Sequence, residues 1–324
     1  MPFTWWLIFG IIVAALLALD LGVFTKRGKE LSMREALTGI AFRVAVAIAF
    51  NIGLYFGLIG NYPTPAAQHQ AGLEFLTGYL VEIALSIDNV FVFALVFRYF
   101  RVPSTLQQRV LFWGILGALV MRAVLIFAGI SLMNSVHWVI YIFAIILIYG
   151  GIKMMRDSGA EVDPGANPLV KLFRRFCPVT PDFVGDKFMT KIDGRMFATP
   201  LLLVLIVIET TDLVFAVDSI PAVLAVTRDP FIVFTSNVFA ILGLRALYFA
   251  LAGILGLFRF LHYGLSAILI FVGIKMLLSH TPLHIPTAVS LGVVCTLLIA
   301  SVVASLAIPA KPGEKGSDDP SALH

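Results

Sequence analysis

Nine apolar stretches of about 20 residues dominate the sequence and limit what this chain can fold into. A helix of about 20 residues spans a bilayer, and only helices and closed barrels satisfy every backbone group there. The sequence therefore predicts an all-α membrane protein with nine transmembrane helices. We place the spans at about 5–25, 37–59, 72–97, 110–130, 136–154, 199–224, 231–252, 262–279 and 286–308.

The composition supports a membrane protein. Of 324 residues, 60% are hydrophobic and 13% are charged, whereas soluble domains are about 45–50% apolar and about 25% charged. The formal net charge of +4 does not indicate a nucleic-acid partner, because basic residues of membrane proteins gather in cytoplasmic loops. The N-terminal stretch lacks a basic leader and a small-residue cleavage site, so we interpret it as a retained first helix.

The connections between the spans alternate in positive charge. The connection after the first span carries Lys26, Arg27, Lys29 and Arg34, whereas the next one, 60–72, contains no lysine or arginine. The rule that positive loops stay inside predicts an N-terminus outside the membrane and a C-terminus in the cytoplasm. Nine spans also require the two ends to lie on opposite sides.

The predicted membrane domain, 1–310, contains one large loop and is followed by a short tail. The cytoplasmic loop 156–198 contains Asn167–Phe176, where apolar and basic residues alternate as in a helix on the membrane surface. The tail, 311–324, is polar and rich in proline, glycine and serine, so we predict a disordered cytoplasmic tail.

Spans three to five share polar landmarks with spans six to eight. The segments EIALSIDNV (82–90) and DLVFAVDSI (212–220) both carry an acid, an aspartate six residues later and then a small polar residue. Because each unit has three spans, the second unit enters the membrane from the opposite side. We therefore predict an inverted repeat of 72–155 and 199–279, an architecture of many secondary transporters. Further matches pair 114–123 with 240–246 and 148–155 with 270–277.

Carboxylates lie inside two of the predicted spans. Each acid at the bilayer centre costs about 2.5–3.5 kcal/mol on insertion scales. Asp212 and Asp218 are about 120° apart on a regular helix. Either the helix breaks, since Pro221 would free the carbonyl of Val217, or the acids face different neighbours. The acids concerned are Glu82, Asp88, Glu209, Asp212 and Asp218.

The spans offer Arg122 and Arg245 as buried cations, which leaves three excess negative charges when all five acids are ionised. Protonation or a bound divalent cation would remove this excess, and purely structural ion pairing is the alternative. Oxygen ligands without a cysteine or histidine cluster suit Mg²⁺, Ca²⁺ or Mn²⁺. We predict a metal site formed by Glu82, Asp88, Asn89, Glu209, Asp212 and Asp218.

Neutral oxygens in the same spans have two interpretations. They could ligate a cation, or they could form hydrogen bonds between helices. The residues concerned are Asn89, Thr210, Thr211, Ser219 and Asn237.

Motifs of enzymes are missing from the sequence. It contains no HExxH, GxSxG or Walker motif, and Cys177 and Cys295 form no metal or disulfide pattern. We therefore expect no enzyme, no cofactor and no ATP-driven pump. Gradient-coupled or facilitated transport is the favoured function, and a membrane scaffold and a Ca²⁺/H⁺-type exchanger are the alternatives. The sequence predicts no oligomeric state.

Segments 82–97 and 209–227 resemble the two signature segments of the TerC family of integral membrane proteins. The connecting segments NPLVKLFRRFCPVT (167–180) and DGRMFATP (193–200) resemble its Alx-like branch. The resemblance implies a multi-pass protein of the bacterial inner membrane that exports Mn²⁺, with the five acids required. It also implies the alternative, since some members are assigned roles in membrane-protein biogenesis.

Overall fold

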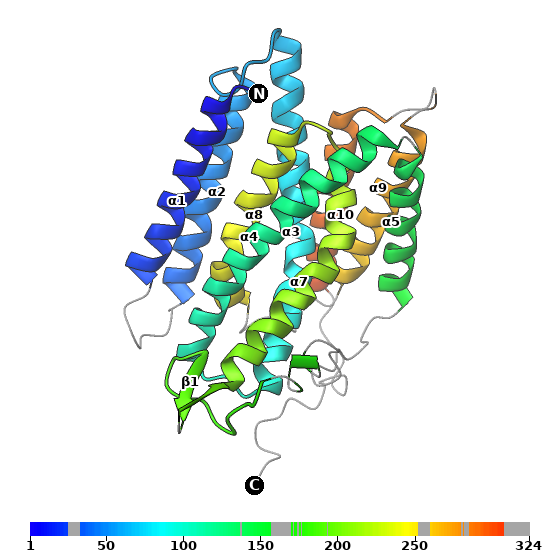
Figure 1. Cartoon of the computed structure of the whole chain (residues 1–324). Coiled ribbons are helices and arrows are strands. Elements are labelled where there is room, and N and C mark those ends of the chain that lie inside the picture. Colours follow the sequence, from blue (N-terminus) through cyan, green and yellow to red (C-terminus); the bar gives the residue numbers. More distant parts are fainter. Residues whose placement is uncertain are drawn as a thin grey trace.

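The computed structural model shows a bundle of long helices with a small two-stranded sheet at one end (Figure 1). The N-terminus lies at the other end of the bundle. The structure describes residues 1–24, 33–136, 138–156, 170, 172–173, 175, 177–192, 194–251, 260–279, 281 and 285–307. Its elements are α1 (Phe3–Phe24), α2 (Met33–Tyr55), α3 (Pro65–Tyr99), α4 (Ser104–Ser135), α5 (Val139–Arg156), β1 (Met189–Ile192), β2 (Arg195–Ala198), α7 (Pro200–Leu224), α8 (Pro230–Leu251), α9 (Leu261–Leu278) and α10 (Thr287–Ala307).

The nine helices within these described residues overlap the nine predicted spans one by one, in chain order. This confirms the all-α membrane fold. Eight of the helices are long and apolar enough to cross a membrane. The first helix is apolar over Phe3–Leu19, where its side chains are described, and this part is shorter than the others.

Helix α3 begins seven residues before the predicted span, at Pro65 rather than at 72. Thr64 caps it, because its Oγ1 accepts a hydrogen bond from the backbone N–H of Ala67 at 3.2 Å. Pro65 then takes a first-turn position, where a backbone N–H has no partner in the helix. With 35 residues α3 is about 52 Å long and extends beyond its neighbours (Figure 1).

Helix α7 is continuous from Pro200 to Leu224, although Pro221 lies inside it. The break that Pro221 would allow is therefore not formed. Pro221 lacks the N–H that would bond to the carbonyl of Val217, but it falls in the last turn, and the helix continues through it only as far as Leu224. The helix is intact, so Asp212 and Asp218 face different neighbours, which was the other interpretation of their spacing.

Helices α5 and α9 pack closely at two glycines that occupy matching positions in the predicted repeat. A Cβ added to Gly151 would lie 2.8 Å from the backbone oxygen of Ser266, and one added to Gly273 would lie 2.9 Å from that of Ala144. The side chains of Ile270 and Ile148 meet the same two glycines in turn. Small residues let helices approach in this way, and reciprocal contacts are expected of segments related by a twofold axis.

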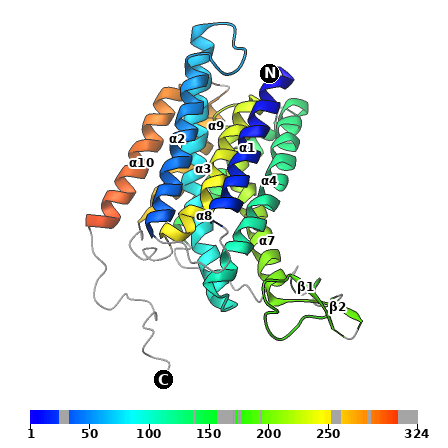
Figure 2. The ribbon, with the colours of Figure 1, turned by 90° about the vertical axis from the view of Figure 1, so that its left-hand side faces the viewer.

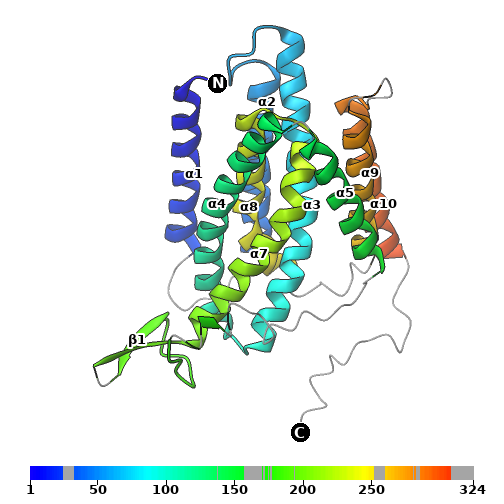
Figure 3. The same ribbon diagram turned by 45° about the vertical axis from the view of Figure 1, so that its right-hand side comes forward.

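Strands β1 and β2 form an antiparallel hairpin in which Met189 pairs with Ala198 and Ile192 with Arg195. Gly194 has a φ of 82°, which suits the tight turn. Arg109 of α4 ties the preceding segment to the bundle through an ion pair with Asp186. Figures 2 and 3 show the hairpin projecting beyond the start of α7, and we call this end of the molecule the hairpin end.

Two predicted segments cannot be compared with the structure. Most of the expected surface helix Asn167–Phe176 and all of the tail 311–324 lie outside the described residues. They remain predictions.

Candidate functional site

Glu82 and Asp212 are brought together in the middle of the bundle. Glu82 lies midway between Pro65 and Tyr99 in α3, and Asp212 lies midway between Pro200 and Leu224 in α7. The two residues are 0% and 2% exposed. Two buried carboxylates need a compensating positive charge, because an unpaired charge in a medium of low dielectric is very costly.

Arg122 of α4 supplies this charge. Its Nη1 donates a hydrogen bond to Oε1 of Glu82 in a close ion pair. Its Nη2 lies 3.1 Å from Oδ1 of Asp212, and its Nε lies 3.4 Å from Oδ2. A guanidinium that grips a carboxylate through two nitrogens is held in position as well as neutralised. The internal pairing of acids with Arg122 that the sequence suggested is therefore observed.

Neutral oxygens complete this centre. Nη1 of Arg122 also donates to Oγ of Ser219 at 3.2 Å and to Oδ1 of Asn237 at 3.4 Å. Nδ2 of Asn89 donates to Oδ1 of Asp212 at 3.3 Å. Helices α3, α4, α7 and α8 thus converge on a few polar atoms. We call this group of residues the polar centre: Glu82, Asn89, Arg122, Asp212, Ser219 and Asn237.

Three buried oxygens on one face of α3 have no hydrogen-bond partner among the described residues. They are Oε2 of Glu82, Oγ of Ser86 and Oδ1 of Asn89. The spacing of four and then three residues places them in one row along the helix. Buried polar atoms are nearly always paired, so such a row calls for an explanation. A row of oxygens that can accept but are not bonded is suited to a hard cation.

Ser86 was not among the predicted site residues. A signal was present, because Ser86 lies four residues after Glu82 and three before Asn89. The corresponding residue of the second predicted repeat is Ala216, so this position is not one of the shared polar landmarks. The hydroxyl belongs to the first repeat alone.

The other three predicted acids lie away from the polar centre and are half-buried. A Cβ added to Gly117 of α4 would overlap the carboxylate of Glu209, and one added to Gly150 of α5 would lie 3.2 Å from Oδ1 of Asp218. Both carboxylates are thus placed against glycines of neighbouring helices. Within the described residues Asp88, Glu209 and Asp218 form no ion pair.

The six predicted ligands therefore do not gather at one point. Glu82, Asn89 and Asp212 meet, whereas Asp88, Glu209 and Asp218 lie elsewhere along α3 and α7. In the part of the chain that the structure describes, no three histidine, cysteine, aspartate or glutamate side chains are grouped as metal ligands would be. Of the other polar candidates, Thr210 and Thr211 donate to carbonyls of their own helix, at 2.5 and 2.7 Å.

Arg245, the second buried arginine, does not join the acids. Its Nη2 donates to Oε1 of Gln108 at 3.2 Å. The shared landmarks pair the segments that contain the two arginines, 114–123 and 240–246, but the arginines do not match in position. Arg122 follows the shared glycine Gly117 by five residues, whereas Arg245 follows Gly243 by two, so relative to that glycine they lie about one helical turn apart.

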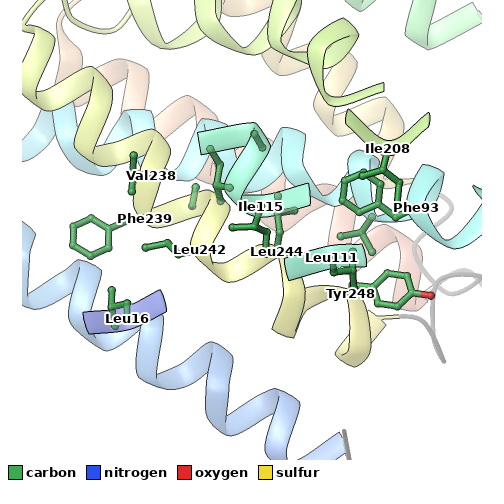
Figure 4. Close-up of a cluster of buried hydrophobic side chains, with 14 of the residues drawn as sticks. Leu16, Phe93, Leu111, Ile115, Ile208, Val238, Phe239, Leu242, Leu244 and Tyr248 are labelled. Carbon is green, nitrogen blue, oxygen red and sulfur yellow. The ribbon is translucent and has the colours of Figure 1, made fainter. Parts of the chain in front are cut away.

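A narrow pocket reaches Asp212 beside the first halves of α4 and α7. It is lined by apolar side chains and has room for about one water molecule. Asp212 is its acidic lining residue. Figure 4 shows five of the apolar lining residues, which come from four helices: Phe93, Leu111, Ile115, Ile208 and Leu244. Because α4 and α7 both begin at the hairpin end, the pocket approaches the polar centre from that end.

Comparisons with known proteins agree with the resemblance seen in the sequence. Residues 67–312 match the model of the integral membrane protein TerC family. A Myxococcus xanthus membrane protein, STKORF319, is 48% identical over 93% of this chain and 91% of its own length. The provisionally named membrane-bound redox modulator Alx of Escherichia coli K12 is 46% identical over 91% of this chain and 92% of its own length. No solved structure matches the chain.

Proposed function

Because the chain belongs to the TerC family of integral membrane proteins, we propose that it is a secondary transporter that exports a hard divalent cation, Mn²⁺, from the cytoplasm. The observation that carries this proposal is the row of unpaired oxygens of Glu82, Ser86 and Asn89 beside the carboxylate of Asp212. The preference for manganese rests on the family resemblance, since oxygen ligands alone suit Mg²⁺, Ca²⁺ and Mn²⁺ equally.

The charges of the site favour a cation as the substrate. When all groups are ionised, Glu82 and Asp212 carry two negative charges and Arg122 carries one positive charge, which leaves the polar centre with one negative charge. Asp88, Glu209 and Asp218 add further negative charge along the same two helices. Acids inside a membrane commonly mark ion pathways. We propose that these three acids bind the cation before and after it occupies the polar centre.

The direction of transport follows from the proposed orientation. Positive charge in the connections favours an orientation with the hairpin end in the cytoplasm and the N-terminus outside. The family resemblance favours the bacterial inner membrane as the location. The pocket beside Asp212 then lies on the cytoplasmic side of the polar centre, the side from which an exporter loads its substrate.

The inverted repeat provides a mechanism for alternating access. The reciprocal contacts of Gly151 and Gly273 between α5 and α9 support it. In transporters of this design one repeat rocks against the other around a site near the midplane. The polar centre lies between α3 and α4 of the first repeat and α7 and α8 of the second, where such a motion would expose it alternately to the two sides.

The name of the Alx relatives suggests a role in redox balance. The polar centre contains no cysteine, and Cys177 and Cys295 form no disulfide with each other, so the site itself points to cation binding rather than to thiol chemistry. The scaffold alternative accounts for the ion pairs of Arg122 but not for the unpaired oxygens on α3. We therefore retain transport as the proposal.

Export of a dication against an inside-negative potential needs a driving force, about 4.6 kcal/mol at 100 mV for two charges. We propose exchange for protons. In inside-out vesicles, Mn²⁺ uptake into the lumen should rise several-fold when the lumen is made acidic relative to the outside, and a protonophore should abolish the rise. An Arg245→Gln variant is the control and should respond to the gradient as wild type does, because this arginine lies outside the polar centre.

Uptake that does not change with the imposed gradient would contradict proton exchange. Ca²⁺ that competes equally with Mn²⁺ for uptake would contradict manganese selectivity.

A further inference from the structure

The guanidinium of Arg122 contacts the oxygens that a substrate cation would use. It donates to the carboxylates of Glu82 and Asp212, and to the side-chain oxygens of Ser219 and Asn237. Carboxylate, hydroxyl and amide oxygens are also the ligands of hard divalent cations. The arginine and a dication are therefore alternative occupants of one set of atoms.

The two cannot share these atoms in the observed geometry. Arg122 is 1% exposed, and an arginine keeps its charge in proteins. Like charges a few ångströms apart repel strongly where water is excluded. A dication that binds Glu82 and Asp212 must therefore displace the guanidinium from at least one of them.

The first contacts of an entering cation are nevertheless available. Oε2 of Glu82, Oγ of Ser86 and Oδ1 of Asn89 are buried and have no hydrogen-bond partner among the described residues. Arg122 bonds to the other carboxylate oxygen of Glu82. A cation can thus be held on the α3 face of Glu82 while the guanidinium still holds its opposite side, and it can then take over the second oxygen.

We propose that Arg122 is a tethered counter-cation. It neutralises Glu82 and Asp212 when no substrate is bound, it is displaced by the incoming cation, and its return helps to expel that cation. This inference rests on the proposed transport of a divalent cation. In this proposal Arg122 is a positioning residue, which acts on the substrate through Glu82 and Asp212.

The placement of Arg122 also connects substrate binding to motion. Arg122 lies on α4 of the first predicted repeat, whereas Asp212, Ser219 and Asn237 lie on α7 and α8 of the second. Displacement of the guanidinium removes four hydrogen bonds between the two units. A substrate that breaks contacts made in one state and not in the other shifts the balance between the states.

The test is direct binding of Mn²⁺ to the full-length protein in detergent, measured by titration calorimetry on wild type, Arg122→Gln and Arg122→Lys. Arg245→Gln is the matched control, because Arg245 is also a buried arginine but bonds to Gln108. We expect Arg122→Gln to bind Mn²⁺ about tenfold more tightly than wild type, and Arg245→Gln to differ by less than about twofold. Mn²⁺ should also raise the melting temperature of Arg122→Gln by more than that of wild type. A residue that merely supported the fold would not improve affinity when it is removed.

Arg122→Lys keeps the inference testable if Arg122→Gln does not fold. A lysine retains the charge but cannot grip a carboxylate through two nitrogens, so we expect it to be displaced more easily and affinity to rise about threefold. Unchanged or weaker Mn²⁺ binding by the folded Arg122 variants would overturn the inference and leave the proposed function standing. Failure of wild type to bind Mn²⁺ would overturn both.

Discussion

At the scale of single residues, the charges in the membrane interior fall into two groups. Glu82 and Asp212 are buried and paired with Arg122, whereas Asp88, Glu209 and Asp218 are half-buried and form no ion pair among the described residues. Replacing an acid by its amide should affect stability differently in the two groups, because only Glu82 and Asp212 compensate the buried charge of Arg122.

Glu82→Gln should destabilise the protein, and Asp218→Asn should not. Removing one partner of a buried ion pair costs about 3–5 kcal/mol, while an unpaired acid contributes less than about 1 kcal/mol. Thermal unfolding in detergent without added metal checks this. An equal loss of melting temperature in both variants would contradict the division into paired and unpaired acids.

Ser86→Ala should weaken Mn²⁺ binding about three- to tenfold without lowering the melting temperature. Its hydroxyl has no hydrogen-bond partner in the described structure, so its removal leaves no protein group newly unpaired. Ser266→Ala is the control, because this buried hydroxyl donates to the backbone oxygen of His262 at 2.8 Å in α9. Identical Mn²⁺ affinity in wild type and Ser86→Ala would show that the hydroxyl is not a ligand.

The site was only partly predictable at this scale. The acids and both arginines stand out in the sequence because charge inside an apolar span is expensive. Which arginine would meet the acids could not be predicted, because a difference of three residues after the shared glycine moves the side chain about one turn along the helix. The sequence does not show which polar groups of the other helices lie at that level. Ser86 was overlooked because a serine inside a membrane helix has an ordinary role in hydrogen bonding.

At the scale of elements, the apolar periods predicted the helices well and their ends poorly. The sixth predicted span, 199–224, agrees with α7 to within one residue. The start of α3 was missed by seven residues, because Thr64 and Pro65 form a helix start outside the apolar stretch. The hairpin was not predicted, although Asp193 and Gly194 between two short strands are a recognised turn signal.

Gly151→Ala should lower the free energy of unfolding by about 1–3 kcal/mol, because the added methyl group meets the backbone of α9. Gly273→Ala should cost a similar amount, since its contacts with α5 are reciprocal. Gly292→Ala in α10 is the control, with no atom within 4 Å of the added Cβ. Denaturant unfolding measures all three. A loss in only one of the first two variants would contradict the reciprocal packing.

At the end opposite the hairpin, a hydrogen bond joins the α2–α3 connection to the α7–α8 connection. The hydroxyl of Tyr62 donates to Oδ2 of Asp229 at 3.1 Å. Oδ1 of Asp229 accepts the backbone N–H of Phe231 at the start of α8. Burial, and then the charge of Asp229, raise the pKa of Tyr62 above its ordinary value of 10.0. The stabilisation from this contact should be fully present below about pH 10 and lost as pH rises through the raised pKa.

The melting temperature of wild type should therefore fall more between about pH 8 and about pH 11 than that of Tyr62→Phe. The variant lacks the hydroxyl and hence both the bond and its titration. Parallel pH curves for the two proteins would contradict the role assigned to this contact.

At the scale of the whole molecule, the sequence predicted the architecture because nine apolar stretches and an alternation of loop charge leave few arrangements. The family match over residues 67–312 supports the same conclusion. The inverted repeat stays a prediction from shared landmarks, and those landmarks do not predict which unit supplies which groups to the polar centre. The first predicted repeat supplies Glu82, Asn89 and Arg122 to the polar centre, and the second supplies Asp212, Ser219 and Asn237.

The central claim is that the acids of α3 and α7 carry a divalent cation out of the cell. The most direct test is the manganese content of bacteria that lack their own exporter and express wild type, Asp88→Asn or Asp218→Asn, with membrane expression measured in parallel. The account predicts low manganese with wild type and, at equal expression, manganese as high as in cells without the protein for both variants. Variants that lower cellular manganese as well as wild type does would contradict it.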